Sequence, residues 1–103
     1  MQAPASVVMI RPHQFSPNPA TAVDNAFQTG DVGLTHTAVA AAAYHEVTRA
    51  AQRLESAGIT VHLFEDEGVA SPDSVFPNNW FSTHAGGHVA IYPMFSPSRR
   101  NER

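Results

Sequence analysis

The chain has 103 residues, of which 43% are hydrophobic and 15% are charged, and its formal net charge is -3. This length supplies one small domain with a modest core. The excess of acidic residues argues against a nucleic-acid groove. No apolar stretch approaches the roughly 18 to 20 residues of a membrane helix, and residues 1–10 lack the pattern of a signal peptide. We therefore expect a cytoplasmic protein that binds neither nucleic acid nor membrane.

The first predicted element is a buried strand at residues 6–10, which a proline at position 12 should end. Residues 12–33 then form a loop without sustained periodicity, and loops of such length in small domains are usually functional or disordered.

A long amphipathic helix is predicted from Thr37 onward, because apolar residues recur there at spacings of three and four. Thr35 or Thr37 is the expected N-cap, and Gly58 followed by Ile59 is typical of a helix that ends in a left-handed glycine. The predicted inner face carries Ala40, Tyr44, Val47, Ala51 and Leu54, and the solvated outer face carries Glu46, Arg49, Gln52, Arg53 and Glu55.

A second strand is predicted at residues 59–64, parallel to the first, because a helix connects the two. Residues 80–84 and 88–92 predict a hairpin around Gly86 and Gly87. Ser96 followed by Pro97 is typical of a helix start with a capping serine. We expect from this late helix signal that the 103 residues are the N-terminal part of a longer, truncated α/β domain.

A metal site is weakly indicated, because only His84 and His88 lie close together in sequence. If Ala85 pairs with His88, the two imidazoles point to opposite faces of the hairpin, and no third ligand has a recognisable spacing. We expect no metal and no other cofactor. The remaining histidines should lie at the surface or at an interface: His13, His36, His45 and His62.

The densest group of polar residues lies at residues 71–80 and includes Asp73, Asn78 and Asn79. One carboxylate and two amides suit a planar, amide-like ligand. From composition alone, simple turn formation is the favoured interpretation. Arg99 and Arg100 have guanidinium groups suited to a substrate carboxylate, but from composition alone a solvated run of charges is the favoured interpretation.

The chain resembles the pentein superfamily of guanidino-group modifying enzymes, and within it most closely the citrulline-utilisation hydrolase branch. The resemblance rests on residues 7–12, 25–28, 72–84 and 97–103, and the block at 72–84 is the most specific. It implies a propeller of ββαβ blades, of which residues 1–103 supply the first blade and part of the second. In this superfamily a cysteine attacks the guanidinium or ureido carbon and a histidine moves the proton. The chain has no cysteine, so we assign no catalytic residue to it.

The resemblance implies that Asp73, Asn78 and Asn79 bind the guanidino end of the substrate and that Arg99 holds its α-carboxylate. Related hydrolases carry two acids where this chain has Asn78 and Asn79. Two neutral amides fit an uncharged ureido group better than a guanidinium, so citrulline is the preferred substrate class and arginine the alternative.

Two functions remain open. The first is the substrate-binding section of a cysteine-dependent hydrolase or amidinotransferase, inactive alone, whose partner is the remainder of the same propeller. The second is a truncated, non-catalytic module that binds a ligand or forms a homo-oligomer through its open blade edges.

Overall fold

A computed structural model describes residues 3–18 and 35–103 of the chain. The resembling segment at residues 25–28 and most of the predicted loop, residues 19–33, lie outside the described residues. The described elements, in chain order, are strand β1 (Ser6–Pro12), helix α2 (His36–Ser56), strand β2 (Thr60–Asp66), the 3-10 helix η1 (Pro77–Asn79), strands β3 (Phe81–His84) and β4 (His88–Ile91), and the 3-10 helix η2 (Pro97–Glu102).

Strands β1 and β2 form a parallel pair, which confirms the prediction from the intervening helix. Their register runs from Ser6 opposite Thr60 to Pro12 opposite Asp66. Strand β1 ends at Pro12, the residue predicted to stop it. One further bond, from the backbone N–H of His13 to the carbonyl of Asp66, extends the pairing by one step.

Helix α2 begins and ends at the predicted signals. Thr35 is the N-cap, and its hydroxyl accepts a 3.2 Å hydrogen bond from the backbone N–H of Ala38. At the other end Gly58 has a φ of +90°, and Ile59 donates its N–H to the carbonyl of Leu54 at 3.0 Å. This 6→1 bond is the Schellman arrangement, in which a left-handed glycine reverses the chain toward the next strand.

Strands β3 and β4 form the predicted antiparallel hairpin, but the predicted placement of its histidines is wrong. His84 pairs directly with His88 across the hairpin. The turn has three residues and not two, because both Gly86 and Gly87 adopt positive φ after Ala85. The two histidines therefore share one face of the hairpin.

The helix predicted after Ser96 is a short 3-10 helix, η2, and the serine side chain makes no capping hydrogen bond. Proline at its first position still fits the start of the turn. The consequence for the site is that η2 brings Arg99 back over the turn that precedes β3.

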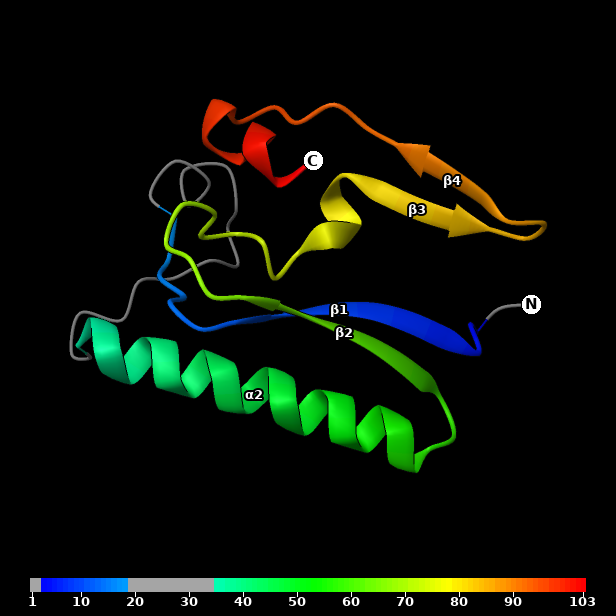
Figure 1. Cartoon of the computed structure of the whole chain (residues 1–103), viewed down its shortest axis with the longest axis horizontal. Helices are drawn as coiled ribbons and strands as arrows, with labels where there is room; N and C mark the ends of the chain where they lie inside the picture. The colour runs from blue at the N-terminus through cyan, green and yellow to red at the C-terminus, as the bar shows by residue number, and fades with distance from the viewer. Residues whose placement is uncertain (1–2, 19–34) are drawn as a thin grey trace.

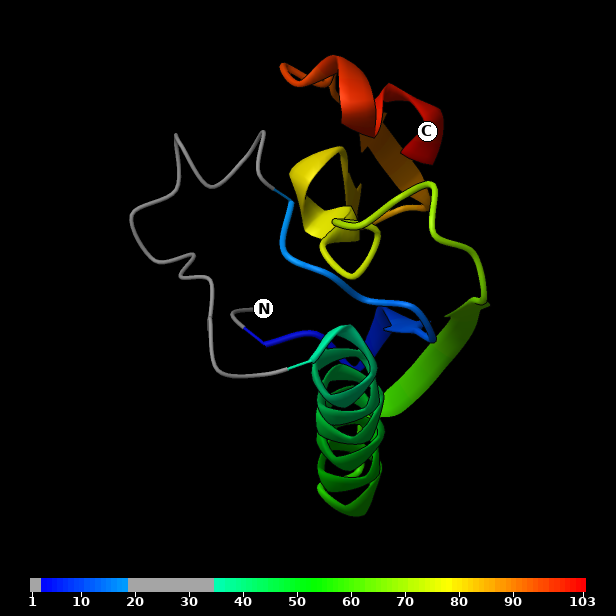
Figure 2. The ribbon, with the colours of Figure 1, turned by 90° about the vertical axis from the view of Figure 1, so that its left-hand side faces the viewer.

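The elements form three layers (Figure 1), with α2 beneath the parallel pair and the β3–β4 hairpin on its other side. Figure 2, which looks nearly along α2, shows the same order of layers. Among the described residues, the buried apolar side chains are Ala40, Ala51, Met94 and two prolines, Pro12 and Pro77, so the core is small. Ala40 and Ala51 lie on the predicted inner face of α2, and its predicted outer face is exposed. No helix in residues 3–18 and 35–103 has the length and hydropathy to cross a bilayer.

Candidate functional site

The segment between β2 and β3 is a series of tight turns, as composition predicted. Four backbone hydrogen bonds of 3.0 to 3.1 Å build it, each from an N–H to a carbonyl three residues earlier. The hydroxyl of Ser74 also donates to the Asp66 carboxylate and so fixes the segment to the end of β2. Because these turns are rigidly bonded, they hold Asp73, Asn78 and Asn79 in defined positions. The four donors are Ser74, Phe76, Asn79 and Trp80.

Arg99 is the centre of this site. Its Nε and Nη2 donate to the two carboxylate oxygens of Glu102, both at 2.9 Å, and its Nη1 donates to Oδ1 of Asn79 at 2.7 Å. Nη2 also donates to the backbone carbonyls of Asp73 at 3.1 Å and Phe76 at 3.3 Å. The hydrogen bonds to Glu102 raise the pKa of Arg99, with a further contribution from the charge of Asp73, against the opposing effect of burial. The guanidinium thereby joins η2 to the turn segment and stays charged.

Asp73 is buried, with 3% of its surface exposed, and its carboxylate accepts a 2.9 Å hydrogen bond from Nδ2 of Asn18. Nε of Arg99 lies 3.8 Å from the same carboxylate oxygen. Asn18 is also buried and contacts the hydroxyl of Ser98 at 3.5 Å. Three separate segments of the chain therefore meet at Asp73, which satisfies the requirement that a buried charge be paired.

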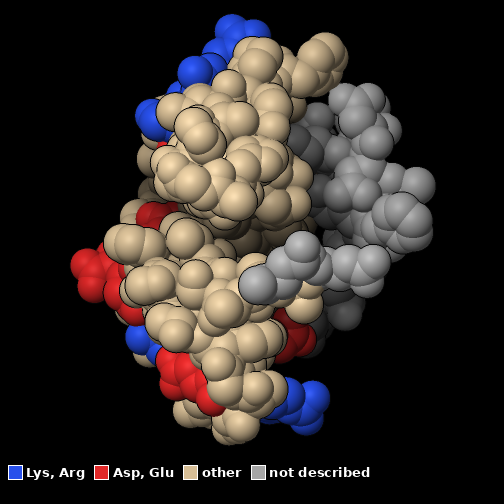
Figure 3. Space-filling view, turned by 90° about the vertical axis from the view of Figure 1, so that its right-hand side faces the viewer, with Lys and Arg blue, Asp and Glu red and all other residues tan. Residues whose placement is uncertain are grey.

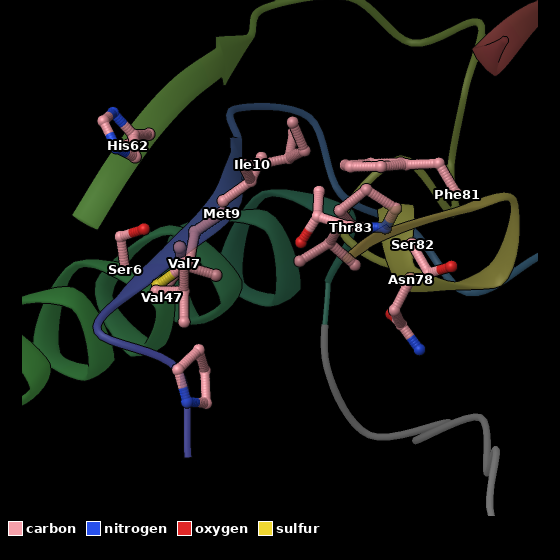
Figure 4. Close-up of a pocket in the computed structure, with 14 residues that line it drawn as sticks. Ser6, Val7, Met9, Ile10, Val47, His62, Asn78, Phe81, Ser82 and Thr83 are labelled. Atoms are coloured by element: carbon pink, nitrogen blue, oxygen red, sulfur yellow. The ribbon is translucent and has the colours of Figure 1, made fainter. Parts of the chain in front are cut away.

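Asn78 lies apart from this network. It lines an open groove of about 500 Å³ between strand β1 and the start of β3. Figure 4 shows Asn78 together with Phe81 and Ser82, while the labelled residues of β1 line the other side of the groove. In residues 3–18 and 35–103 no hydrogen bond to the Asn78 amide is found, so its donors and acceptor are available to a ligand.

A second polar cluster lies where β1 and β2 end. Arg11 donates from Nε and Nη2 to the carboxylate of Glu65 at 2.9 and 2.8 Å, and His13 contacts the same carboxylate at 2.8 Å. The hydrogen bonds from Arg11 and then His13 lower the pKa of Glu65, and the bond to Glu65 raises the pKa of Arg11. Arg11 also lies 4.6 Å above the ring of Tyr44 and donates to Thr48, which ties the strands to α2. The contacts of this cluster hold the strands against α2, and among the described residues none of the hydrogen bonds and ring contacts of Arg11, His13 and Glu65 involves Asp73.

Within the part of the chain that the structure describes, no three histidine, aspartate or glutamate side chains are arranged to hold a metal ion. His84 instead makes a 2.8 Å hydrogen bond with the hydroxyl of Ser82, which in turn bonds to Tyr92 at 2.8 Å. His36, His45 and His62 are exposed, as predicted, and His13 is partly exposed.

The structure therefore brings together three of the four residues named from the sequence, Asp73, Asn79 and Arg99, and leaves Asn78 facing the groove. Sequence reasoning missed two members of the network, Asn18 and Glu102. Glu102 follows Arg99 by three residues, and an i, i+3 charge pair in a helical turn was a usable signal. For Asn18 the only signal in the sequence was its position between two prolines, in the loop predicted to be functional or disordered.

A comparison with protein-family models places these residues in a known context. The model described as N,N dimethylarginine dimethylhydrolase, eukaryotic, matches residues 11–103, which include the whole network of Asn18, Asp73, Asn79, Arg99 and Glu102. No curated protein and no solved structure matches the chain. The matched family acts on the guanidino group of arginine derivatives and is part of the superfamily that the sequence resembles. The chain therefore belongs to the dimethylarginine dimethylhydrolase family of the pentein superfamily.

Proposed function

We propose that this chain is the substrate-binding section of a hydrolase or amidinotransferase that acts on the ureido or guanidino carbon of citrulline or arginine derivatives. The observation that carries the proposal is the family match over residues 11–103, which spans the turn segment and η2. The described geometry is compatible, because the turn between the two sheets exposes two amides. That of Asn78 lies at the edge of the groove, and that of Asn79 accepts a hydrogen bond from Arg99.

The four proposed binding residues have different surroundings. Asn78 and Asn79 are exposed and suited to direct contact, whereas Asp73 and Arg99 are buried. A substrate carboxylate at Arg99 would take the place of Glu102, which holds the paired N–H groups of the guanidinium. The proposed role of Asp73 is to supply the negative charge beneath the amides.

The proposed fold is a propeller blade with part of a second. The unit of β1, α2 and β2 corresponds to three elements of a ββαβ blade, and the β3–β4 hairpin to the first two elements of the next. Residues of β1 and β3 line the groove, and the two strands lie on the facing sides of the two strand pairs (Figure 1). In this proposal further strands would pair with these edges.

Binding of L-citrulline and L-arginine, measured by calorimetry on the chain as it stands, tests the proposal. Asn78→Ala and Asn79→Ala should each weaken binding by about tenfold, the effect of one lost hydrogen bond. Gln52→Ala, on the exposed face of α2, is the control and should bind like the unchanged protein. Absence of binding for both amino acids would contradict the proposal.

The chain by itself should release no ammonia from either amino acid. The chemistry that the family resemblance implies needs a cysteine thiolate, and the 103 residues contain none. An assay of ammonia release with the purified chain measures this directly. Turnover would show that a group other than a cysteine thiolate attacks the ureido or guanidino carbon.

A second candidate function is a non-catalytic module that associates with copies of itself. Large apolar side chains on the hairpin are exposed, including Val89 at 60% and Ile91 at 58%. Figure 3 shows a face with few charged residues and a hollow between its upper and lower parts. Such a surface favours association.

Analytical ultracentrifugation separates the two candidates. A self-associating module should sediment as a defined oligomer, and Ile91→Asp should convert it to a monomer, whereas Gln52→Asp on the exposed face of α2 should not. A monomer at all concentrations would remove this second candidate and leave the first in place.

A further inference from the structure

His84 and His88 face each other across the β3–β4 hairpin. They are directly opposite in the register, and both side chains are exposed. Opposite residues in an antiparallel pair have Cβ atoms about 4.5 to 5.5 Å apart and share one face of the sheet. Two imidazoles at this spacing are able to bind one metal ion, because bonds from a metal to histidine nitrogen are about 2.0 to 2.1 Å long. A register shifted by one residue would put the two imidazoles on opposite faces, and the structure excludes it.

The ring of His84 is oriented by two hydroxyl groups. Its Nε2 lies 2.8 Å from the hydroxyl of Ser82, and that hydroxyl lies 2.8 Å from the hydroxyl of Tyr92. When Nε2 carries the proton and donates it to Ser82, the lone pair of the imidazole is on Nδ1. In metal sites, the ring nitrogen that does not bind the ion usually donates to a partner of this kind, which fixes the tautomer and the ring orientation. His84 therefore has the hydrogen bond that is typical of a metal-ligating histidine, with Nδ1 as the ligand atom.

His88 has both of its ring nitrogens available. Neither nitrogen forms a hydrogen bond within the part of the chain that the structure describes. A Cβ at Gly86 would lie 3.3 Å from Cδ2 and 3.4 Å from Nε2 of His88, so the ring lies over the turn, in space that a side chain at residue 86 would occupy. Binding of one ion needs this ring to rotate toward His84, and exposed side chains change rotamer rapidly.

We propose that His84 and His88 together bind one divalent transition-metal ion at the tip of the hairpin, with Cu²⁺ bound more tightly than Ni²⁺ or Zn²⁺. Imidazole nitrogen is a ligand for all three ions, and the affinity of a given nitrogen site is highest for Cu²⁺. Because residues 3–18 and 35–103 hold no group of three histidine, aspartate or glutamate side chains suited to one ion, water completes the coordination. The inference does not depend on the proposed function, since the hairpin tip lies at one end of the molecule, away from η2 (Figure 1).

The other histidines lack this arrangement. His13 is bonded to the carboxylate of Glu65 at 2.8 Å, and His62 lies opposite Val8 in the parallel pair. The two histidines of α2 are not three or four positions apart, the spacing that places two helix side chains next to each other. Among the described residues, the hairpin is therefore where two imidazoles are paired directly by the backbone.

Calorimetric titration of the chain with the chlorides of Cu²⁺, Ni²⁺ and Zn²⁺ tests the inference. One Cu²⁺ per chain should bind in the tightest step. His84→Ala and His88→Ala should each weaken this step by about tenfold or more, because chelation by two linked ligands is lost. His62→Ala is the matched control, since His62 is an exposed strand histidine opposite Val8, and it should bind Cu²⁺ like the unchanged protein. Equal affinity in the unchanged protein and the two hairpin variants would overturn the inference.

A double variant separates the geometry of the pair from the number of histidines. His88→Val combined with Val89→His keeps the six histidines of the chain but moves one of them to the other face of the hairpin, because side chains alternate along a strand. It should bind Cu²⁺ as weakly as His88→Ala, and an affinity equal to that of the unchanged protein would contradict the paired site. Electron paramagnetic resonance of the bound Cu²⁺ should show two imidazole nitrogens in the unchanged protein, and a single nitrogen there would also overturn the inference.

Discussion

Nδ2 of Asn18 donates a 2.9 Å hydrogen bond to Oδ2 of Asp73, although 55 positions separate the two residues in the sequence. Both residues are buried, at 4% and 3% exposure. This contact joins the segment after β1 to the turn that carries the candidate site, so the position of the turn depends on a residue from the other end of the domain.

Replacing Asp73 with alanine should destabilise the protein by about 1–3 kcal/mol, because the buried amide of Asn18 loses its acceptor and Arg99 loses a nearby negative charge. Urea denaturation followed by circular dichroism measures this loss. Glu67→Ala, at an exposed position, is the control. An equal loss in the free energy of unfolding for the two substitutions would show that the buried contact of Asp73 does not stabilise the protein.

Glu102→Leu should cost about 3 kcal/mol, because it leaves the buried guanidinium of Arg99 without its paired acceptor. Arg99→Met together with Glu102→Leu should lose less than the sum of the two single changes, since neither charge is then left alone. The four free energies of unfolding form a double-mutant cycle. Additive losses would mean that the two side chains do not interact.

Glu65 should make the protein less stable in acid. Its pKa is lowered in the folded state by the bonds from Arg11 and His13, so the folded state binds its proton less readily than the unfolded state does. The stability that this pair contributes is complete above the ordinary glutamate pKa of about 4.3 and is lost as the pH falls through the lower, folded-state value.

Melting temperatures of the unchanged protein and of Glu65→Gln, measured between neutral and acidic pH, check this prediction. The gap between the two should be widest near neutral pH and should close on acidification. A gap that stays constant with pH would locate the effect in packing and not in the ionisation of Glu65.

Gly58→Ala should destabilise the protein by about 1–2 kcal/mol, because Gly58 has a φ of +90° that residues with a Cβ adopt at a cost. No atom lies within 4 Å of the added carbon, so the loss measures backbone strain alone. Gly68→Ala is a matched control, since its added carbon would make an ordinary 3.7 Å contact with Asp66. Chemical denaturation of both variants gives the comparison, and equal losses would contradict the assignment to φ.

The elements with strong local signals were predictable from the sequence. Helix α2 has an alanine-rich periodic pattern, the cap Thr35 and the terminator Gly58, and each signal acts within a few residues. The parallel pairing of β1 and β2 followed from the helix between them. The hairpin was predictable from its glycines, but its register was not, because a shift of one turn residue changes which side chains face each other.

The candidate site divides in the same way. The residue types at 73, 78, 79 and 99 were visible in the sequence, together with the resemblance that the family match supports. The sequence did not show the contacts between these residues. Arg99 bonds to Asn79, Glu102 holds Arg99, and Asn18 donates to Asp73.

The sequence by itself determined the secondary structure and the family, because hydrophobic periodicity, caps and turn residues act between near neighbours. Only the tertiary structure decided the contact between Arg99 and Asn79 and the burial of Asp73 and Arg99. These depend on hydrogen bonds between side chains 20 to 55 positions apart, and such bonds form only after the layers have packed and excluded water.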